Sequence, residues 1–385
     1  MKFVLAPDSF KGSLTAKEAT LAMKRGIQTV YPDAEIEMIP MADGGEGTVQ
    51  SLVDATHGQL LTATVTNPLG HPTLATYGLL GDGHTAVIEM AAASGIQYID
   101  DETANPLVTT TYGTGELMRA AMDQGATQLI LGLGGSATND GGAGMAQALG
   151  VQLLKADGTE VAVGGGNLSE LVRIDASRRD PRLDKVEVIM ASDVTNPLTG
   201  NTGASVVFGP QKGATPDQVQ RLDHNLAHYA EVVARDLGIE VAEIPGSGAA
   251  GGLGAGLLAF TSATVERGVE IVLEKTHLRD RVKDADVVFT GEGGMDFQTQ
   301  YGKTPMGVAQ AVKQTAGDLP VIALVGKIGQ GTEVLYELGI DAIFSTVPGV
   351  ETLDQAISEA GSNVQKTAEN VARLIRAMDG CGTAR

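Results

Sequence analysis

The chain has 385 residues, with 47 acidic and 27 basic side chains and a formal charge of −20 at neutral pH. This charge excludes a protein whose main partner is a nucleic acid or an anionic membrane, because such partners require a basic surface. The single cysteine, Cys381, excludes a disulfide within the chain. We expect a cytoplasmic protein of two or three domains, with cores built from its 43% hydrophobic residues.

The chain begins with an alternation of strands and helices. An apolar run at 3–6 predicts a strand, and the next strand is expected at 35–40. Between them, Thr15 and Glu18 have the spacing of a capping box, which predicts the start of a helix. A second helix is expected at 48–56. Strands and helices that alternate in this way predict a parallel sheet.

The middle of the chain has a different pattern. Between 60 and 110, short strand candidates are separated by turn residues. The elements expected after them are a helix at 114–124, a strand at 129–133, a glycine-rich loop at 134–142, a helix at 143–149, a strand at 186–191 and a helix that starts at Thr215 and stops at Gly238.

The last third repeats the pattern of the first. Strands are expected at 286–290, 321–325 and 342–345, with helices at 304–315 and 332–338. Because the two ends are alike and the middle differs, we expect a nested arrangement. Residues 1–66 and 284–385 would form one α/β domain, residues 67–283 would be inserted into it, and the active site would lie in the cleft between the two.

Two polar clusters follow the first two predicted strands, where open α/β sheets bind ligands. In the first, Asp8 is a candidate base or metal ligand, and Ser9 and Lys11 could hold an anionic group. In the second, glycines surround Asp43 and Glu46, so that the backbone can pack closely while both acids point at a ligand. The alternatives are a capped loop with a solvated lysine and an acidic turn in which Glu46 caps the next helix.

The loop 134–142 is a candidate anion cradle. Its glycines allow backbone N–H groups to converge, and the helix that follows adds positive potential. Gly134, Gly135, Ser136 and Asn139 are the candidate phosphate-binding residues. The local spacing only approximates a dinucleotide fingerprint, and a plain turn remains an alternative.

Two further clusters contain candidate site residues. Asp193 follows the strand expected at 186–191, where it could act as a base or a metal ligand, or simply end the strand. Lys212 could meet a phosphate or a carboxylate, or lie on the surface. Gly251 and Gly252 belong to a glycine run that predicts a close-packed helix start near a nucleotide.

The last cluster contains Glu292, Asp296 and Lys303. The two acids could bind Mg²⁺, and the lysine at a helix start could neutralise a phosphate. Gly-Lys-Thr at 302–304 is not a P-loop, because Phe297 stands where that motif needs glycine. Glycine clusters that carry acids and lysines favour phosphoryl transfer, which needs backbone donors, cationic side chains and Mg²⁺.

Taken together, the clusters resemble the bacterial glycerate kinase family of the glyoxylate and glucarate pathways. The residues that carry the resemblance are 6–13, 42–48, 111–117, 134–142, 193–198, 207–214, 248–257, 290–293, 298–299 and 302–305. They span nearly the whole chain in the order of the family.

This resemblance implies ATP-dependent phosphorylation of D-glycerate, usually at the 2-hydroxyl. It also implies a two-domain α/β fold, with a flavodoxin-like parallel-sheet domain from both chain ends and an inserted mixed-sheet domain. Three positions depart from the family's common residues: Arg is frequent at Gly294, Cys at Ser192, and Gly-Ser at 326–327. Lys327 could replace part of the charge that the missing arginine would supply.

We expect direct in-line transfer, with Asp193 preferred over Asp8 as the base and ATP and Mg²⁺ as cofactors. The remaining roles are phosphate or nucleotide binding by Gly134, Gly135, Ser136, Asn139, Gly251 and Gly252, metal binding by Glu292 and Asp296, and substrate binding or catalysis by Ser9, Lys11, Asp43, Glu46, Lys212 and Lys303. The chain would act as a monomer or homodimer. The alternatives are a kinase that forms 3-phosphoglycerate and a non-catalytic sensor of phosphorylated sugar acids.

Overall fold

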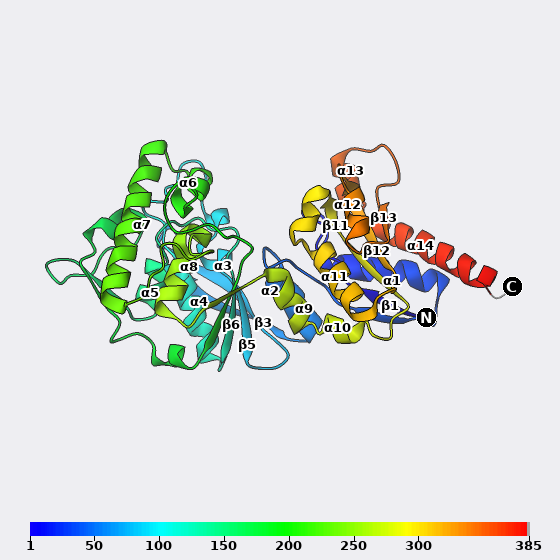
Figure 1. Ribbon diagram of the computed structural model, residues 1–385, viewed down its shortest axis with the longest axis horizontal. Helices are drawn as coiled ribbons and strands as arrows, with labels where there is room; N and C mark the ends of the chain where they lie inside the picture. Colours follow the sequence, from blue (N-terminus) through cyan, green and yellow to red (C-terminus); the bar gives the residue numbers. More distant parts are fainter. Residues whose placement is uncertain (383–385) are drawn as a thin grey trace. The chain divides into compact units, whose positions relative to one another are not determined.

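A computed structural model describes residues 1–382, and the side chain of Cys381 lies outside the part that is described (Figure 1). The chain divides into two compact units. Unit 1 comprises residues 1–43, 50–57 and 269–385, and unit 2 comprises 44–49 and 58–268. The expected fold class is confirmed: both units are α/β, and unit 1 is built from both ends of the chain.

Unit 1 contains a five-stranded parallel sheet in the order β13-β12-β11-β1-β2. Its strands are β1 (Lys2–Leu5), β2 (Glu35–Met38), β11 (Val287–Met295), β12 (Val321–Ile328) and β13 (Ala342–Ser345). Numbered by their order within the unit and read from the other edge, they follow the flavodoxin-like order 2-1-3-4-5.

Helices cover this sheet. They are α1 (Ala16–Val30), α2 (Thr48–Thr56), α9 (Gly268–Lys275), α10 (Leu278–Arg281), η5 (Phe297–Tyr301), α11 (Thr304–Ala316), α12 (Glu333–Glu337), α13 (Leu353–Ser358) and α14 (Ala360–Gly382). The capping box of Thr15 and Glu18 is confirmed at the start of α1. Helix α1 packs along α14, the blue and red helices that lie side by side in Figure 1. The apolar core joins these helices to Phe3, Leu5 and Phe289.

Unit 2 contains a mixed six-stranded sheet in the order β10-β9-β6-β5-β4-β3. Strands β10, β9, β6 and β5 are parallel, and β4 and β3 continue the sheet in antiparallel pairing. The strands of the unit are β3 (Gln59–Thr66), β4 (Pro72–Leu79), β5 (Thr85–Glu89), β6 (Gln128–Gly132), β9 (Glu187–Ala191) and β10 (Thr264–Glu266), with a separate pair, β7 (Gln152–Leu154) and β8 (Arg173–Asp175).

The helices of unit 2 are α3 (Ala91–Ser94), η1 (Ile96–Tyr98), α4 (Tyr112–Asp123), α5 (Ala143–Ala148), η2 (Gly165–Glu170), η3 (Pro181–Asp184), α6 (Ala204–Phe208), η4 (Pro210–Lys212), α7 (Pro216–Leu237) and α8 (Ala249–Phe260). One core cluster joins α4 and α8 to the sheet, and a second joins α7 to α5 and the β7-β8 pair. The predicted limits of the long helix α7 are confirmed, with Thr215 as N-cap and Gly238 in a left-handed conformation at its end.

Several boundaries differ from those expected, and residues 44–49 already belong to unit 2. Residues 59–66 pair with β4 and therefore belong to unit 2 rather than to the domain 1–66. Residues 269–283 belong to unit 1 rather than to an insertion at 67–283. Strand β11 continues to Met295 instead of ending at 290, because β12 extends in parallel with it as far as Ile328.

Candidate functional site

The strand order of unit 1 defines the edge at which a ligand is expected. Strands β1 and β11 are neighbours at the point where the chain order of the sheet reverses. In open α/β sheets the crevice outside the carboxyl ends of such strands is the usual ligand site. Asp8 follows β1, and Glu292 lies toward the carboxyl end of β11. The two carboxylates therefore lie at the same edge of the sheet.

Asp8 is held by its neighbours in a nearly buried position. Its Oδ2 accepts a hydrogen bond from Thr304 Oγ1 at 2.5 Å, and its Oδ1 accepts one from the Ser9 N–H at 2.6 Å. Burial is the main cause that raises the pKa of Asp8 to about 6; the charge of Asp43 contributes to the rise, and the hydrogen bonds from Thr304 and Ser9 oppose it. Asp8 thus titrates close to neutral pH, as a general base requires.

Glu292 is the second carboxylate with a raised pKa. Its side chain is 13% exposed, with Lys303 Nζ at 3.9 Å and a hydrogen bond of 3.1 Å from Thr299 Oγ1. Burial is the main cause that raises the pKa of Glu292 to about 7; Lys303 and the Thr299 hydrogen bond oppose the rise, and the charges of Asp8 and Asp43 contribute to it. Three acids near enough to repel one another make a region that a cation would stabilise.

The start of α11 lies beside these acids. Lys303 is the N-cap residue of this 13-residue helix, and its side chain makes no capping hydrogen bond. Gly302, at φ 112°, turns the chain from η5 into the helix. The first N–H groups of α11 and the Lys303 ammonium together offer positive potential to an anion.

The other candidates of unit 1 have varied surroundings. Lys11 is exposed, and a Cβ at Gly293 would lie 3.2 Å from the Lys11 backbone nitrogen, so the loop after β1 passes over β11. Asp296 caps η5, because its Oδ1 accepts a hydrogen bond of 2.8 Å from the Gln298 N–H. Lys327 lies opposite Gly294 in the β11-β12 register, so its charge stands beside the position where an arginine is frequent in the family.

No group of three or more Asp, Glu, His or Cys side chains within the described residues is arranged to hold a metal ion. Mg²⁺, however, is commonly bound by one or two carboxylates together with substrate phosphates and water. Asp8, Asp43 and Glu292 meet that smaller requirement.

In unit 2, the glycine-rich loop follows β6. Gly134 and Gly135 are exposed and accessible to a ligand, whereas Ser136 is buried, with 7% exposed. Asn139 is fully buried, and its Nδ2 donates to Ser205 Oγ at 2.9 Å. The Oδ1 of Asn139 has no hydrogen-bond partner within residues 1–382.

The start of α5 is occupied by Asp140. Its buried carboxylate accepts hydrogen bonds from the Gly142 and Gly144 N–H groups and from both the N–H and the hydroxyl of Thr111. The expectation that this helix start adds positive potential for a phosphate is therefore wrong, because a protein carboxylate already uses it. Asp140 lies two residues before the N-cap Gly142, and an acid this close to a predicted helix start is the signal that could have identified this role.

Lys212 is only 1% exposed. Its Nζ donates to the Thr138 carbonyl at 2.6 Å. Burial lowers the pKa of Lys212 to about 7, and the charge of Asp140 partly opposes that change. In this position the lysine supports the glycine-rich loop from within the unit.

Gly251 and Gly252 pack against the same loop. Both are buried, with φ values of +69° and +88°, and Gly251 O accepts a hydrogen bond of 3.1 Å from the Gly141 N–H. A Cβ at Gly251 would overlap the Thr138 carbonyl oxygen. These glycines therefore allow close packing of two backbones.

The other two candidate acids of unit 2, Asp193 and Glu46, are exposed. The Asp193 side chain is 41% exposed, and its Oδ1 lies 3.4 Å from Arg267 Nε. Glu46 is also exposed. The start of α2 is bound instead by Glu89, which was not singled out from the sequence and whose Oε1 accepts from the Val49 N–H at 2.9 Å. Glu89 is the last residue of β5, and it reaches the start of α2 because of the way β5 pairs within the sheet.

The fold and this arrangement define a class of protein. It is an α/β protein in which acids, lysines and open glycine loops lie at the carboxyl edges of parallel strands, as in enzymes that transfer phosphoryl groups.

The glycerate kinase family model matches residues 3–376. The chain belongs to the glycerate kinase family.

Several relatives match this chain over nearly their whole length. A glycerate kinase of Halalkalibacterium halodurans is 55% identical over 96% of this chain and 97% of the relative. The glycerate 2-kinase of Escherichia coli is 48% identical over 97% of this chain and 98% of the relative. A crystal structure of a protein from Salmonella typhimurium LT2, assigned as a glycerate kinase 2, superimposes with a TM-score of 0.90 at 49% identity and covers 98% of this chain and 99% of that one.

None of the helices within residues 1–382 combines the length and the apolar character needed to cross a lipid bilayer.

Proposed function

We propose that this chain transfers a phosphoryl group from ATP to D-glycerate and forms 2-phosphoglycerate. The observation that carries the proposal is the group formed by Asp8, Glu292, Lys303 and Thr304 at the carboxyl edge of the unit 1 sheet. In this group Asp8 is a base that titrates near neutral pH, and Lys303 and the start of α11 offer positive charge to a phosphate. Membership of the glycerate kinase family supports glycerate as the acceptor.

Asp8 is the base in this proposal, in preference to Asp193. The glycerate hydroxyl oxygen attacks the γ-phosphorus, the bond from that phosphorus to the bridging oxygen of ADP breaks, and Asp8 Oδ accepts the hydroxyl proton. Asp8 is nearly buried and has a pKa of about 6, whereas Asp193 is exposed beside Arg267. The Thr304 hydroxyl fixes the Asp8 carboxylate toward the edge of the sheet.

Glu292 and Asp43 would hold Mg²⁺, with Asp296 as a further candidate ligand. When bound, the ion neutralises charge on the phosphates during transfer. The mutual repulsion that raises the pKa of Glu292 fits a cation at this position. Lys303 binds the transferred phosphate together with the start of α11, and Ser9 and Lys11 bind the glycerate carboxylate. In unit 2, the exposed residues Gly134 and Gly135 offer backbone donors to an anion.

Incubation with ATP, Mg²⁺ and D-glycerate, followed by phosphorus NMR of the product, tests the reaction and its position. We expect ADP and 2-phosphoglycerate in equal amounts. A 3-phosphoglycerate signal would contradict the choice of hydroxyl. Thermal stabilisation by the ligands without ADP would contradict the kinase assignment and favour the sensor.

A pair of variants tests the choice of base. Asp8→Asn is expected to lower kcat by at least about 100-fold, whereas Asp193→Asn keeps kcat within a few-fold of the unmodified protein. The reverse pattern would move the base to Asp193.

A further inference from the structure

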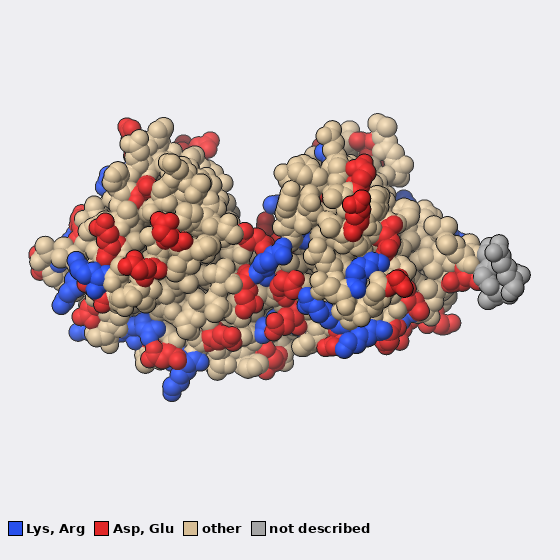
Figure 2. Space-filling view, in the orientation of Figure 1, with Lys and Arg blue, Asp and Glu red and all other residues tan. Residues whose placement is uncertain are grey.

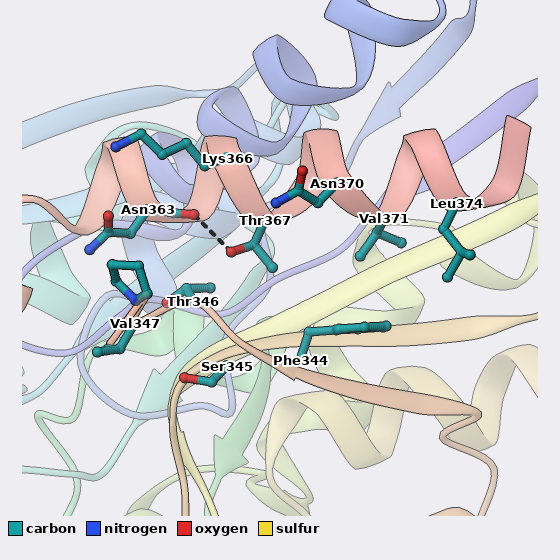
Figure 3. Close-up of a pocket in the computed structure, with 11 residues that line it drawn as sticks. Phe344, Ser345, Thr346, Val347, Asn363, Lys366, Thr367, Asn370, Val371 and Leu374 are labelled. Carbon is teal, nitrogen blue, oxygen red and sulfur yellow. Dashed lines mark hydrogen bonds between the residues drawn. The ribbon is translucent and has the colours of Figure 1, made fainter. Parts of the chain in front are cut away.

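A cavity of about 460 Å³ lies in unit 1 between α14 and the segment that follows β13 (Figure 3). Its volume is within the usual range for a small-molecule site. Strand β13 is two strands from β11 in the same parallel sheet, so the cavity opens at the same carboxyl edge as Glu292. The separation along that edge is roughly 10 Å, from the strand spacing of a sheet. The start of α14 also reaches the loop after β1, since a Cβ at Gly361 would lie 3.7 Å from Leu14 Cδ2.

Asn363 is the unusual residue of this cavity. Its side chain is 2% exposed, and neither the amide nitrogen nor the amide oxygen has a hydrogen-bond partner among residues 1–382. Leaving both atoms unpaired is costly, because a buried amide has lost its hydrogen bonds to water. Figure 3 shows that the amide lies beside the segment from Ser345 to Val347, at the wall of the cavity. A ligand with one acceptor and one donor side by side would satisfy it.

The other residues that line the cavity indicate which kind of ligand it could bind. Phe344, Val371 and Leu374 supply apolar surface, as needed to cover the faces of a flat ring. Asn370 adds a second amide on the same face of α14. Within the set of described lining residues, Lys366 carries the one charge, in a protein with a net charge of −20. A flat, polar-edged ring attached to an anionic group fits this combination.

We propose that this cavity binds the purine base of the nucleotide, with the Asn363 amide paired to the amino group and adjacent ring nitrogen of adenine. A planar carboxamide makes this pair of bonds to adenine with good geometry. Lys366 lies near the phosphates or ribose, and the phosphate chain extends along the carboxyl edge toward Lys303. The proposal rests on the proposed function, because it names the place of the base in the ATP that the kinase uses.

Equilibrium binding of ADP and GDP to the full chain, measured by calorimetry, tests the proposal in two variants. Asn363→Leu removes the amide and keeps a similar volume, and we expect its dissociation constant for ADP to rise at least about 10-fold and its preference for ADP over GDP to disappear. The ligand-free variant should melt at the same or a higher temperature, because an unpaired buried amide has been removed. Lys366→Gln alters only an exposed side chain, and we expect weaker ADP binding with a smaller dependence on salt.

Arg373→Gln is the matched control, since it removes a positive charge from the same helix outside the cavity. It should bind ADP as the unmodified protein does, and the KM for D-glycerate should be unchanged in all three variants. If Asn363→Leu and Lys366→Gln bind ADP normally while the unmodified protein still phosphorylates glycerate, the base lies elsewhere and the inference fails. If ADP binding depends on Asn363 but glycerate is not phosphorylated, the proposed function fails and the inference stands.

Discussion

Two carboxylates at one sheet edge, Asp8 and Glu292, both keep their protons to higher pH than an exposed acid. Burial is the main cause for each, and neighbouring negative charge adds to it. Such a pair is unfavourable for the folded protein when both are ionised. We attribute this arrangement to ligand binding. A bound cation offsets the negative charge of the two acids, and a substrate hydroxyl can donate its proton to one of them.

Glu292→Gln should therefore stabilise the protein at alkaline pH while lowering activity. A carboxyl group whose folded-state pKa is raised, here from 4.5 to about 7, contributes stability below pH 4.5, and that stability is lost as the pH rises through 7. The variant has no carboxyl group to ionise at this position, so we expect its free energy of unfolding to be about 3 kcal/mol higher than that of the parent at pH 8. Calorimetry at pH 4 and pH 8 measures the difference, which should vanish at pH 4. A variant that is no more stable than the parent at pH 8 would contradict the raised pKa.

Thr304→Val should shift the pH profile of the reaction. The Thr304 hydroxyl bond favours the ionised form of Asp8, so its removal raises the pKa of that carboxyl above about 6. We expect the acidic limb of kcat/KM against pH to move to more alkaline pH. Thr315→Val, which removes a hydroxyl bonded only to a carbonyl of the same helix, is the control and should leave the limb in place. An unchanged limb in both variants would remove Asp8 from the base role.

Candidate site residues could be identified from the sequence where a polar residue follows a predicted strand. Asp8 was found in this way, and its neighbour across the sheet edge, Glu292, was found through its glycine cluster. The burial of Lys212 could not be predicted, because it depends on a contact with Thr138, 74 residues away. The capping of α2 by Glu89 likewise depends on which strands become neighbours.

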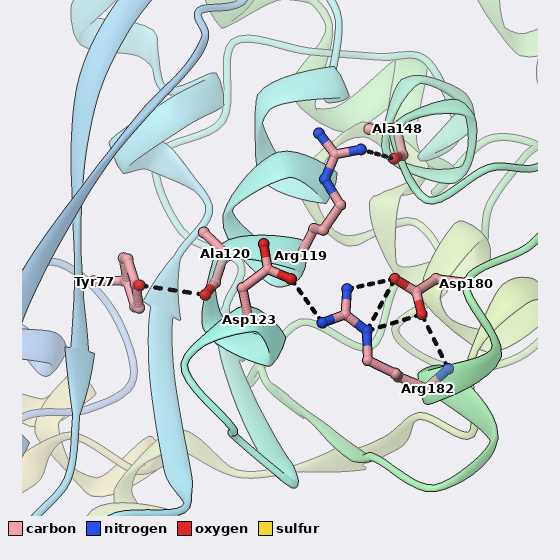
Figure 4. A network of polar contacts seen from close by, with 7 residues as sticks. All are labelled: Tyr77, Arg119, Ala120, Asp123, Ala148, Asp180 and Arg182. Atoms are coloured by element: carbon pink, nitrogen blue, oxygen red, sulfur yellow. Dashed lines mark hydrogen bonds and ion pairs between the residues drawn. The ribbon is translucent and has the colours of Figure 1, made fainter.

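Among the elements of unit 2, a polar network fixes η3 to α4 (Figure 4). Arg182 binds the Asp180 carboxylate at 2.6 Å and Asp123, in the last turn of α4, at 2.7 Å. Arg119 in the same helix donates to the Ala148 carbonyl at the end of α5, and Tyr77 in β4 donates to the Ala120 carbonyl. The hydrogen bond from Arg182 holds the pKa of Asp180 below its ordinary value.

Arg182→Met should destabilise unit 2 by about 1 kcal/mol at pH 7, because the arginine is partly exposed and its ion pairs are screened by water. Asp180 has a lowered folded-state pKa, so its contribution is present above pH 3.8 and is lost as the pH falls further. Denaturant titration at pH 7 and at pH 3 should therefore show a larger difference at pH 7 than at pH 3. Arg178→Met, at an exposed position nearby, should show no difference at either pH.

The glycine run at the start of α8 packs its backbone closely against the loop after β6. Gly251→Ala adds a Cβ that overlaps Thr138 O at a φ of +69°, whereas Gly238→Ala has a φ of +73° and no atom within 4 Å. We expect a loss of about 1 kcal/mol for Gly238→Ala and at least about 3 kcal/mol for Gly251→Ala. Thermal unfolding of both variants separates backbone strain from steric overlap. Equal losses would show that the close packing of the two backbones is not important.

Element limits were predicted best where a local signal was present. The capping residues Thr15 and Thr215 and the stop at Gly238 lie within single helices and need no distant partner. Strand ends were less predictable, because the length of β11 depends on how far β12 continues beside it.

At the scale of the whole molecule, the two units have separate apolar cores. The cluster that contains Phe3, Ile27 and Val371 shares no residue with the two clusters described in unit 2. Acidic side chains are distributed over the visible face of both units, with basic ones in small groups among them (Figure 2). We therefore expect two calorimetric transitions rather than one.

Gly26→Val should lower one transition and leave the other unchanged. A Cβ at Gly26 would lie 2.9 Å from the Glu369 backbone nitrogen, so a larger side chain forces α1 away from α14. Gly349→Val, in the same unit with no atom within 4 Å, is the control and should change neither transition. Hydrogen exchange should show faster opening in unit 1 alone. Equal losses in both units would show that they unfold together.

The pairing of β1 with β11 has a consequence for how the protein is made. A ribosome that has just released β1 must still add about 280 residues before β11 emerges, which takes tens of seconds at ordinary rates of translation. Throughout that time the entire stretch 58–268 can fold while the apolar strand Lys2–Leu5 has only β2 as a neighbour. We therefore expect nascent chains of this protein to contain a folded second unit before the parallel sheet of the first unit can be completed.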